Sequence, residues 1–394
     1  MGEHLLFLYL ATGGGHIGAA RALAAEVGRR HRQEDVRVTI ADGIKEGEDF
    51  QRGLVEDGFR FTAIRYPVLW AGLYEWSRLQ VVMDLQTRLM CRYSVPYFEE
   101  LIPRLKPTRV ILFHFLLVRP LRWAYRRLGY RLPSLTIITD PFTCHPMWFY
   151  QQCMPVACYT PQLRDYASRR YGVAPESMMV KNPIINHAYD RPMDHSKARA
   201  LKSTYGLSQE RDMVLIVGGG EGLPRGERYL DEMLRLNREA DVVFVAGKND
   251  ELRAEAEKVA LRWQGRRTAK TVVYGFVDFM SDLMNMSSVI VTKGGPASVL
   301  EAAMLEKPIM IAHYFYGQER GNVDFVVKNG LGSYTQTPRG TAEAVMSLLA
   351  SPEAVRQVAR HYDRVRLTNG TPEFADLLFT FDQDPPPVPR LAHG

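Results

Sequence analysis

The segment Thr292–Asn322, TKGGPASVLEAAMLEKPIMIAHYFYGQERGN, decides the fold class of this chain. It closes an apolar strand with a glycine pair, opens a helix at Pro296, and continues into a second apolar strand, Pro308–Ala312. A strand, a glycine loop and a helix in this order direct backbone N–H groups and the positive end of a helix dipole at an anion, commonly a phosphate. The segment therefore predicts an α/β unit with an anion site at the end of a strand.

Side chains in the same segment indicate what else the anion carries. Lys293 adds a cation to the glycine loop, and Glu301 lies inside the helix, where a carboxylate can bind a vicinal diol. Gln318 follows the second strand and offers an amide to further hydroxyls. Diphosphate, ribose and sugar hydroxyls together describe a nucleotide sugar.

The alternation of strand, loop and helix runs through the chain twice. It starts at Leu5–Leu10 and restarts at Met213–Val217, which leads into Gly218-Gly219-Gly220. Such alternation is typical of parallel sheets with helices on both faces, which bind ligands beyond the carboxyl ends of their strands. Further strands are predicted at Val36–Ile40, Arg109–Phe113, Leu135–Thr139, Cys158–Tyr159, Val242–Val245, Thr271–Tyr274, Val289–Thr292 and Pro308–His313.

Four collinear blocks carry a resemblance to a known family. They read TGGGH at Thr12–His16, TIITDPFTCHPMWF at Thr136–Phe149, GGGEG at Gly218–Gly222, and KGGP to GQERGN between Lys293 and Asn322. The chain resembles glycosyltransferases with two facing Rossmann-like domains (the GT-B fold), in the branch of the lipid II N-acetylglucosaminyltransferase. It is most similar to the monogalactosyldiacylglycerol synthases, from about residue 10 to about residue 335.

Composition and the resemblance give a domain plan. Proline, aspartate and basic residues replace the apolar runs near residues 186–199, where we expect a hinge. We expect an acceptor and membrane-facing domain at 1–185 and a nucleotide-sugar domain at 200–368. The resemblance implies a helix at 369–382 that crosses back to the first domain, and a proline-rich tail at 383–394 is predicted to be disordered.

The resemblance also implies roles for individual residues. His16, at a helix start, is the expected general base, since an imidazole is largely neutral at pH 7. Asp140, at a strand end, is the second candidate for orienting or activating the acceptor. The expected acceptor ligands are Gly14, Gly15, His145 and Trp148, and the expected donor ligands are Gly218, Gly219, Gly220, Phe276, Val277, Lys293, Gly294, Gly295, Pro296, Glu301, Gln318, Glu319 and Asn322.

Several patterns admit simpler interpretations. The glycine loops can serve only as tight turns, and Phe276 can be a core residue. His114 with Thr143-Cys144-His145 suggests a metal site, but the spacing is irregular and packing is the simpler reading. We therefore predict no metal and no cofactor, with the UDP-sugar acting as a substrate.

Composition excludes some classes of protein. The 394 residues are 46% hydrophobic and 24% charged, as in globular proteins, and no apolar run approaches the ~20 residues that span a bilayer. The opening LLFLYLA runs into TGGGH and is predicted to be a first strand, not a signal peptide. The net charge of +6 permits nucleic-acid binding, but no recognition motif accompanies it, and we predict no nucleic-acid partner.

Two stretches predict contact with an anionic membrane surface. Aromatic residues gather between Phe59 and Trp76, and no acidic residue occurs from Leu101 to Thr139. Aromatic wedges and basic residues together are typical of interfacial proteins, although a solvated basic helix and an aromatic core are an alternative. The membrane residues proposed from this pattern are Trp70, Trp76, Arg122, Arg126 and Arg127.

The sequence thus predicts a peripheral, inverting glycosyltransferase at the cytoplasmic face of a membrane. It moves a hexose, expected to be galactose, from a UDP-sugar to diacylglycerol. Ile17 replaces a basic residue that similar synthases have after the histidine, and HYFYG lacks their usual proline, which leaves the sugar open. The alternatives are a UDP-N-acetylglucosamine or UDP-glucose transferase with another lipid acceptor, and a non-catalytic nucleotide-sugar or lipid-binding protein.

Overall fold

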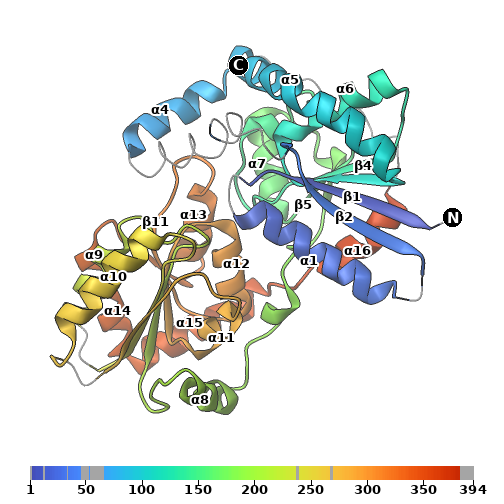
Figure 1. Cartoon of the computed structure of the whole chain (residues 1–394). Helices are drawn as coiled ribbons and strands as arrows, with labels where there is room; N and C mark the ends of the chain where they lie inside the picture. The colour runs from blue at the N-terminus through green and yellow to red at the C-terminus, as the bar shows by residue number, and fades with distance from the viewer. Residues whose placement is uncertain are drawn as a thin grey trace. The chain divides into compact units, whose positions relative to one another are not determined.

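The computed structural model describes residues 2–11, 14–32, 34–45, 53, 66–236, 239–266 and 269–381. The chain divides into two compact units (Figure 1). Unit 1 comprises Met1–Asn186, Phe315–Gln318 and Asn369–Gly394, and unit 2 comprises His187–Tyr314 and Glu319–Thr368. Each unit is described by itself below.

Unit 1 is built on a parallel sheet of six described strands in the order β2-β1-β3-β4-β5-β6. The inner strands are almost wholly buried because helices cover both faces of the sheet (Figure 1). The strands are β1 (Glu3–Tyr9), β2 (Val36–Asp42), β3 (Arg109–Leu112), β4 (Ser134–Ile137), β5 (Val156–Cys158) and β6 (Met178–Val180).

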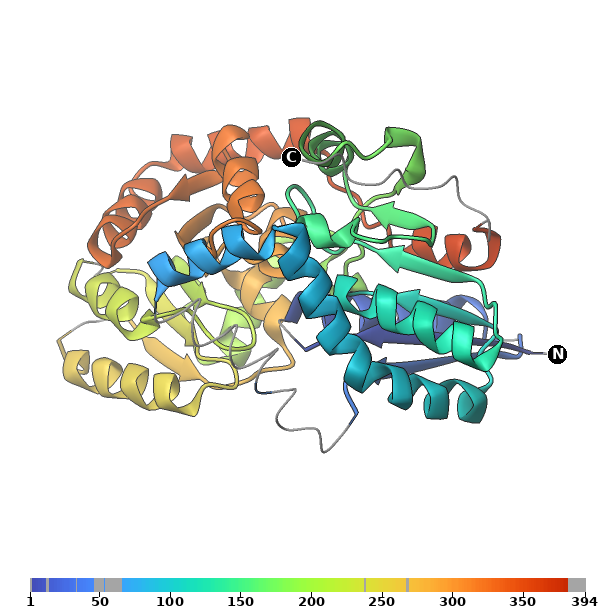
Figure 2. The ribbon, with the colours of Figure 1, turned by 90° about the horizontal axis from the view of Figure 1, so that it is seen from above.

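The helices of unit 1 pack their apolar sides on this sheet. One core cluster gathers Leu6, Phe98 and Leu121 from β1, α5 and α6, and a second surrounds Trp148. Helices α5 and α6 lie side by side (Figures 1 and 2). The helical elements are α1 (Gly14–Arg30), α4 (Pro67–Ser77), α5 (Gln80–Leu105), η2 (Phe115–Leu117), α6 (Val118–Leu128), η3 (Pro146–Trp148), α7 (Pro161–Tyr171), η4 (Pro175–Ser177) and α16 (Thr371–Thr380).

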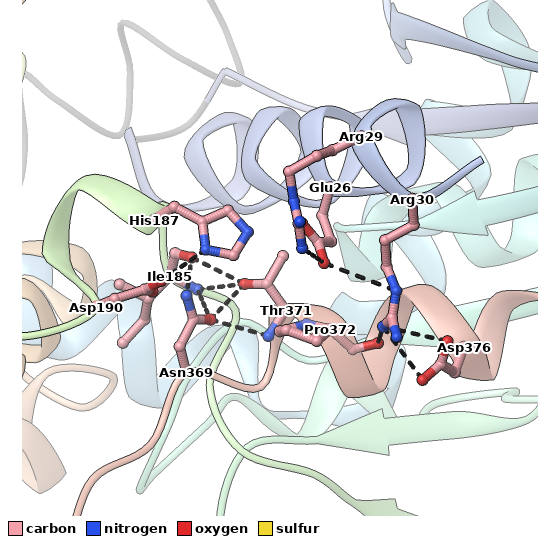
Figure 3. A network of polar contacts seen from close by, with 10 residues as sticks. All are labelled: Glu26, Arg29, Arg30, Ile185, His187, Asp190, Asn369, Thr371, Pro372 and Asp376. Carbon is pink, nitrogen blue, oxygen red and sulfur yellow. Dashed lines mark hydrogen bonds and ion pairs between the residues drawn. The ribbon is translucent and has the colours of Figure 1, made fainter. Parts of the chain in front are cut away.

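Helix α16 packs on α1, although the two come from opposite ends of the chain. Arg30 Nη1 donates to the carbonyl of Pro372 at 2.8 Å and to Asp376 Oδ2 at 3.2 Å (Figure 3). The Thr371 hydroxyl donates to the carbonyl of Ile185 at 2.8 Å. Phe374 and Leu378 are fully buried, so α16 contributes to the core of unit 1.

Unit 2 repeats the design with a parallel sheet of six described strands in the order β12-β11-β10-β7-β8-β9. Its strands are β7 (Met213–Val217), β8 (Asp241–Val245), β9 (Thr271–Tyr274), β10 (Val289–Lys293), β11 (Ile309–His313) and β12 (Gly332–Tyr334). Its helical elements are η5 (His187–Tyr189), α8 (His195–Thr204), α9 (Gly226–Leu236), α10 (Asp250–Trp263), α11 (Met280–Met286), α12 (Pro296–Met304), α13 (Arg320–Lys328), α14 (Pro338–Leu349) and α15 (Pro352–Val365).

The prediction of an α/β chain with two parallel sheets is confirmed. The sequence did not predict the edge strands β6 and β12, and α8 begins at His195, within the stretch expected to be a hinge. No helix within the described ranges is long and apolar enough to cross a membrane.

Candidate active site

Adjacent strands of unit 1 bring the predicted acceptor residues to one edge of the sheet. Helix α1 begins after β1, His114 follows β3, and Thr139-Asp140 follows β4. Because these strands are neighbours and parallel, their carboxyl ends meet at the same edge. Gly14 opens α1 in exposed backbone, and Gly15 is half-buried behind it.

His16 lies among aromatic rings at this edge. Its Nδ1 is 2.8 Å from the hydroxyl of Thr139, and its ring centroid is 4.8 Å from that of His114. Burial lowers the pKa of His16 to about 4, and a hydrogen bond to the backbone of Phe113 partly offsets this effect. The imidazole is therefore neutral near pH 7, which is the form that a general base requires.

Asp140 is held by a tryptophan. The indole N–H of Trp148 donates to Asp140 Oδ2 at 2.8 Å, and the Trp148 ring centroid is 6.3 Å from that of His16. Trp148 is fully buried in a core cluster. A residue that binds the acceptor would be exposed at the site, whereas Trp148 is buried. It packs beneath the site and orients Asp140.

His145 links the loop that follows β4 to α4. Its Nδ1 accepts from the backbone N–H of Met147 at 3.2 Å, so its Nε2 carries the proton and donates to the Ser77 hydroxyl at 3.0 Å. The Ser77 hydroxyl donates in turn to the carbonyl of Tyr74 at 2.7 Å. His145 is buried, and burial together with the charge of Arg78 lowers its pKa to about 3.

Cys144 and His114 are buried inside unit 1. Cys144 is fully buried, and His114 Nδ1 accepts from the backbone N–H of Leu116 at 3.2 Å. Among the residues that the structure describes, no three or more His, Cys, Asp or Glu side chains are grouped so as to hold a metal ion.

Gln318 groups with unit 1. Its carbonyl accepts from the Thr143 hydroxyl at 3.1 Å, and Trp70 Nε1 donates to the carbonyl of Tyr316 at 3.3 Å. Gly317 has φ +89°, and a Cβ there would lie 2.2 Å from the ring of Tyr74. Only glycine fits this position. The other predicted donor residues belong to unit 2.

In unit 2 the order of the strands sets the order of the donor residues. The carboxyl ends of β11, β10, β7, β8 and β9 follow one another along the edge. They present His313, Lys293, the glycine loop 218–220, Lys248 and Phe276 in that sequence. Cations therefore flank the glycine loop on both sides.

The glycine loop is fixed by close backbone contacts. A Cβ on Gly218 would lie 2.0 Å from the amide nitrogen of Leu223, and Gly219 has φ +74°. The backbone N–H of Lys248 donates to the carbonyl of Gly220 at 2.7 Å. A Cβ on Gly247, which has φ +67°, would lie 2.3 Å from the same carbonyl oxygen. The loops after β7 and β8 thus pack backbone against backbone, and Gly218 and Gly247 leave no room for a side chain there.

The second glycine loop leads into the N-terminus of α12. Gly295 is the N-cap of α12 and makes no side-chain cap, with Pro296 at the first turn. The N–H groups of such a first turn have no partner within the helix and suit an anion. The side chain of Lys293 passes this turn, because its Cε would lie 3.4 Å from a Cβ on Gly295 and 3.7 Å from one on Gly219.

Asn322 and Glu319 lie behind this loop. Asn322 Nδ2 donates to the carbonyl of Gly294 at 2.7 Å, and its Oδ1 is buried without a hydrogen-bond partner. Glu319 is buried, with Oε1 3.7 Å from a Cβ on Gly295. The buried amide of Asn322 positions the loop from beneath, where the sequence had suggested a direct ligand.

Glu301 and Phe276 are the remaining predicted donor residues of unit 2. Burial raises the pKa of the half-buried Glu301 to about 7, and its charge contributes to the raised pKa of Tyr189. Phe276 is 64% exposed, unlike a core residue, and the partly buried Val277 follows it. The sequence interpretation omitted Lys248, although Ala246-Gly247-Lys248 has the same strand-end glycine as the predicted loops.

Both units match known families. Residues 16–181 match the family model "Monogalactosyldiacylglycerol (MGDG) synthase", and residues 213–354 match "Glycosyltransferase family 28 C-terminal domain". The chain is 28% identical over 404 residues to monogalactosyldiacylglycerol synthase 2, chloroplastic, of Arabidopsis thaliana, covering 93% of this chain and 82% of the relative. A probable monogalactosyldiacylglycerol synthase 2 of Oryza sativa subsp. indica is 28% identical over 375 residues, covering 91% and 74%.

Solved structures agree on the fold. MurG of Acinetobacter baumannii superposes with a TM-score of 0.58 at 14% identity, covering 96% of this chain and 99% of that one. The ranges that the family models match contain His16, Glu301 and the glycine loops of unit 2. The chain is thus similar to the monogalactosyldiacylglycerol synthases over most of its length.

Proposed function

We propose that this protein transfers galactose from UDP-galactose to the free hydroxyl of diacylglycerol, with inversion at the sugar C1. The observation that carries the proposal is the first turn of α12, which has no side-chain cap from Gly295, with Lys293 beside it and Glu301 further along the same helix, in a chain whose relatives are named monogalactosyldiacylglycerol synthases. Such a turn binds a diphosphate, and a carboxylate in the same helix binds the ribose.

Most of the residues proposed to bind the donor lie at the edge of unit 2. The N–H groups of the glycine loop and of α12, together with Lys293, take up the negative charge that develops on UDP as it leaves. Glu301 accepts hydrogen bonds from the ribose hydroxyls. Phe276 and the backbone of Val277 hold the uracil, and Gln318 binds the sugar. These groups neutralise the diphosphate without a metal ion or cofactor.

The acceptor roles follow from the edge of unit 1. Neutral His16 removes the proton of the diacylglycerol hydroxyl while its oxygen bonds to C1 and the bond from C1 to the diphosphate oxygen breaks. The hydrogen bond between Thr139 and His16 Nδ1 fixes the ring orientation during this step. Asp140, oriented by Trp148, directs the acceptor hydroxyl, and Gly14 and Gly15 leave room for the lipid.

A lipid acceptor calls for contact with a membrane, and unit 1 has a surface suited to it. Leu69, Leu73 and Trp76 of α4 are 53%, 37% and 53% exposed, at a spacing that puts them on one side of the helix. Leu79 and then Val81, Leu85 and Leu89 of α5 continue the exposed apolar row. We call these seven residues the apolar face.

Helix α6, which packs against α5, carries basic residues. Trp123 of α6 is 40% exposed, and Arg126 and Arg127 are exposed on the same helix. Arg122 is half-buried nearby in sequence. Apolar area inserts into the interface while arginines meet anionic headgroups, each contributing ~1 kcal/mol. The proposal is therefore a peripheral enzyme at the cytoplasmic face of an anionic membrane.

The predicted aromatic wedge is revised accordingly. Trp76 lies on the apolar face, whereas Trp70 is half-buried and donates to the Tyr316 carbonyl. Phe59 and Phe61 lie outside the described residues. Exposed leucines of α4 and α5 add to the apolar surface that Trp76 provides.

An assay with purified protein tests the proposal. Diacylglycerol in anionic vesicles is supplied with UDP-galactose, UDP-glucose or UDP-N-acetylglucosamine, and the products are separated and their anomeric linkage determined by NMR. We expect a β-galactosyl diacylglycerol that His16→Ala does not form. Preference for another UDP-sugar refutes galactose, and UDP binding without transfer to any lipid refutes catalysis.

A further inference from the structure

None of the donor-binding roles proposed above involves the ammonium group of Lys248. It follows β8 at the same sheet edge as the glycine loop, and its side chain is exposed. In the part of the chain that the structure describes, no ion pair to its ammonium occurs. Its Nζ lies 5.5 Å from the centroid of the exposed Phe276 ring.

The backbone of Lys248 is joined to the glycine loop. Its N–H donates to the carbonyl of Gly220 at 2.7 Å, and Gly247 approaches that carbonyl too closely for any side chain. Asn249 caps α10 by accepting from the N–H of Leu252 at 2.9 Å, which fixes the loop on its other side. The starting point of the Lys248 side chain is therefore rigid.

The strand order puts Lys248 opposite Lys293. Lys293 ends β10 and Lys248 follows β8, with β7 and its glycine loop between them. The Lys293 side chain runs along Gly219 and Gly295, on the α12 side of the loop. The Lys248 side chain runs the other way, toward Phe276.

A nucleoside diphosphate has its own fixed order of base, ribose, α-phosphate and β-phosphate. In the proposed site the base lies at Phe276 and the diphosphate lies at the glycine loop. A cation that starts at the loop and extends toward the base meets the phosphate nearer the base. A cation on the far side of the loop meets the other phosphate.

We propose that Lys248 binds the α-phosphate of the donor nucleotide, while Lys293 binds the β-phosphate across the glycine loop. This inference rests on the proposed donor site of unit 2. The two ammonium groups then neutralise one phosphate each. Lys248 contributes to nucleotide binding, and Lys293 to the charge that appears on the leaving β-phosphate oxygen.

Nucleotides of increasing charge test this division. Uridine, UMP and UDP are titrated into the parent protein, Lys248→Gln and Lys293→Gln, by calorimetry or by competition for the weaker ligands. A hydrogen bond to a charged group is lost in each variant, so affinity falls about 10-fold or more where the phosphate is present. Lys248→Gln should weaken UMP and UDP equally and leave uridine unchanged. Lys293→Gln should weaken UDP and leave UMP within about 2-fold of the parent.

A matched control removes charge without touching the edge. Lys258 is an exposed lysine on α10, and Lys258→Gln should bind all three ligands like the parent. Unchanged UMP affinity in Lys248→Gln overturns the inference. Equal weakening of uridine also overturns it, because the ammonium then contacts the base. A parent protein that binds neither UMP nor UDP overturns the donor site and this inference together, whereas normal UDP binding with an insensitive Lys248→Gln overturns the inference alone.

Discussion

The affinity for UDP should depend on pH because of Glu301, and substitution of Glu301 should remove this dependence. Burial raises the pKa of this carboxyl to about 7, so the ligand-free protein holds it protonated below that pH. Two ribose hydroxyls donate hydrogen bonds best to the carboxylate form. Binding therefore favours loss of the proton, and UDP should bind more tightly as pH rises through 7.

The size of the effect follows from the two pKa values. If the bound nucleotide returns the carboxyl to its ordinary pKa of 4.5, the affinity at about pH 6 is about 10-fold below that at about pH 8. At about pH 6 each binding event releases about 0.9 proton from Glu301. Calorimetric titration in buffers of different ionisation enthalpy measures both quantities.

Glu301→Gln separates this effect from the titration of UDP itself. The amide does not ionise, whereas the terminal phosphate of UDP titrates equally with both proteins. The difference between parent and variant then isolates Glu301. Identical pH dependence in the two proteins would show that Glu301 does not contact the nucleotide, and tighter binding at low pH would reverse the assigned sign.

The turnover number at saturating UDP-sugar should stay level down to about pH 5, because the pKa of His16 is lowered to about 4; an acid limb near pH 6.5 would argue against His16 as the base. Leu73→Ser with Leu85→Ser should reduce vesicle flotation at every salt concentration, since apolar burial is not screened, whereas losses in Arg122→Gln with Arg126→Gln should fade at high salt. Parent-like flotation of both pairs would place the membrane contact elsewhere. Gly247→Ala should cost about 2–4 kcal/mol in urea unfolding, through its positive φ and overlap with Gly220. Gly265→Ala, also at positive φ but in open space, should cost only about 1 kcal/mol, and equal losses would refute the overlap.

Central strands were predictable because their sequences are unambiguous. Met213–Val217 and Thr271–Tyr274 are apolar runs that end at glycine, and the structure has β7 and β9 at those bounds. The edge strands β6 and β12 have three residues each, and β12 contains a glycine and is only half-buried. They exist because a neighbouring strand offers them hydrogen bonds, which no local pattern reports.

The predicted site residues were chosen by position, and position does not give the direction of a side chain. Trp148 and Asn322 lie where the motifs suggested, but both are buried and support Asp140 and Gly294. Lys248 was missed because its relevance depends on Gly220, a residue in the loop of another strand. The sequence pattern did not reveal the apolar face, because Leu69 and Leu73 form a surface only through the pitch of α4.

The packing of α16 on α1 has a consequence for synthesis in the cell. The ribosome makes the first strands and helices of unit 1, then the whole of unit 2, and only afterwards the residues of α16. Until α16 emerges, the sites on unit 1 that receive Phe374 and Leu378 stay uncovered. Unit 2 is thus the first half able to complete its fold during translation, and the nascent acceptor half must wait with exposed apolar surface, a state that chaperones recognise. A stop codon before Asn369 would make that waiting state permanent.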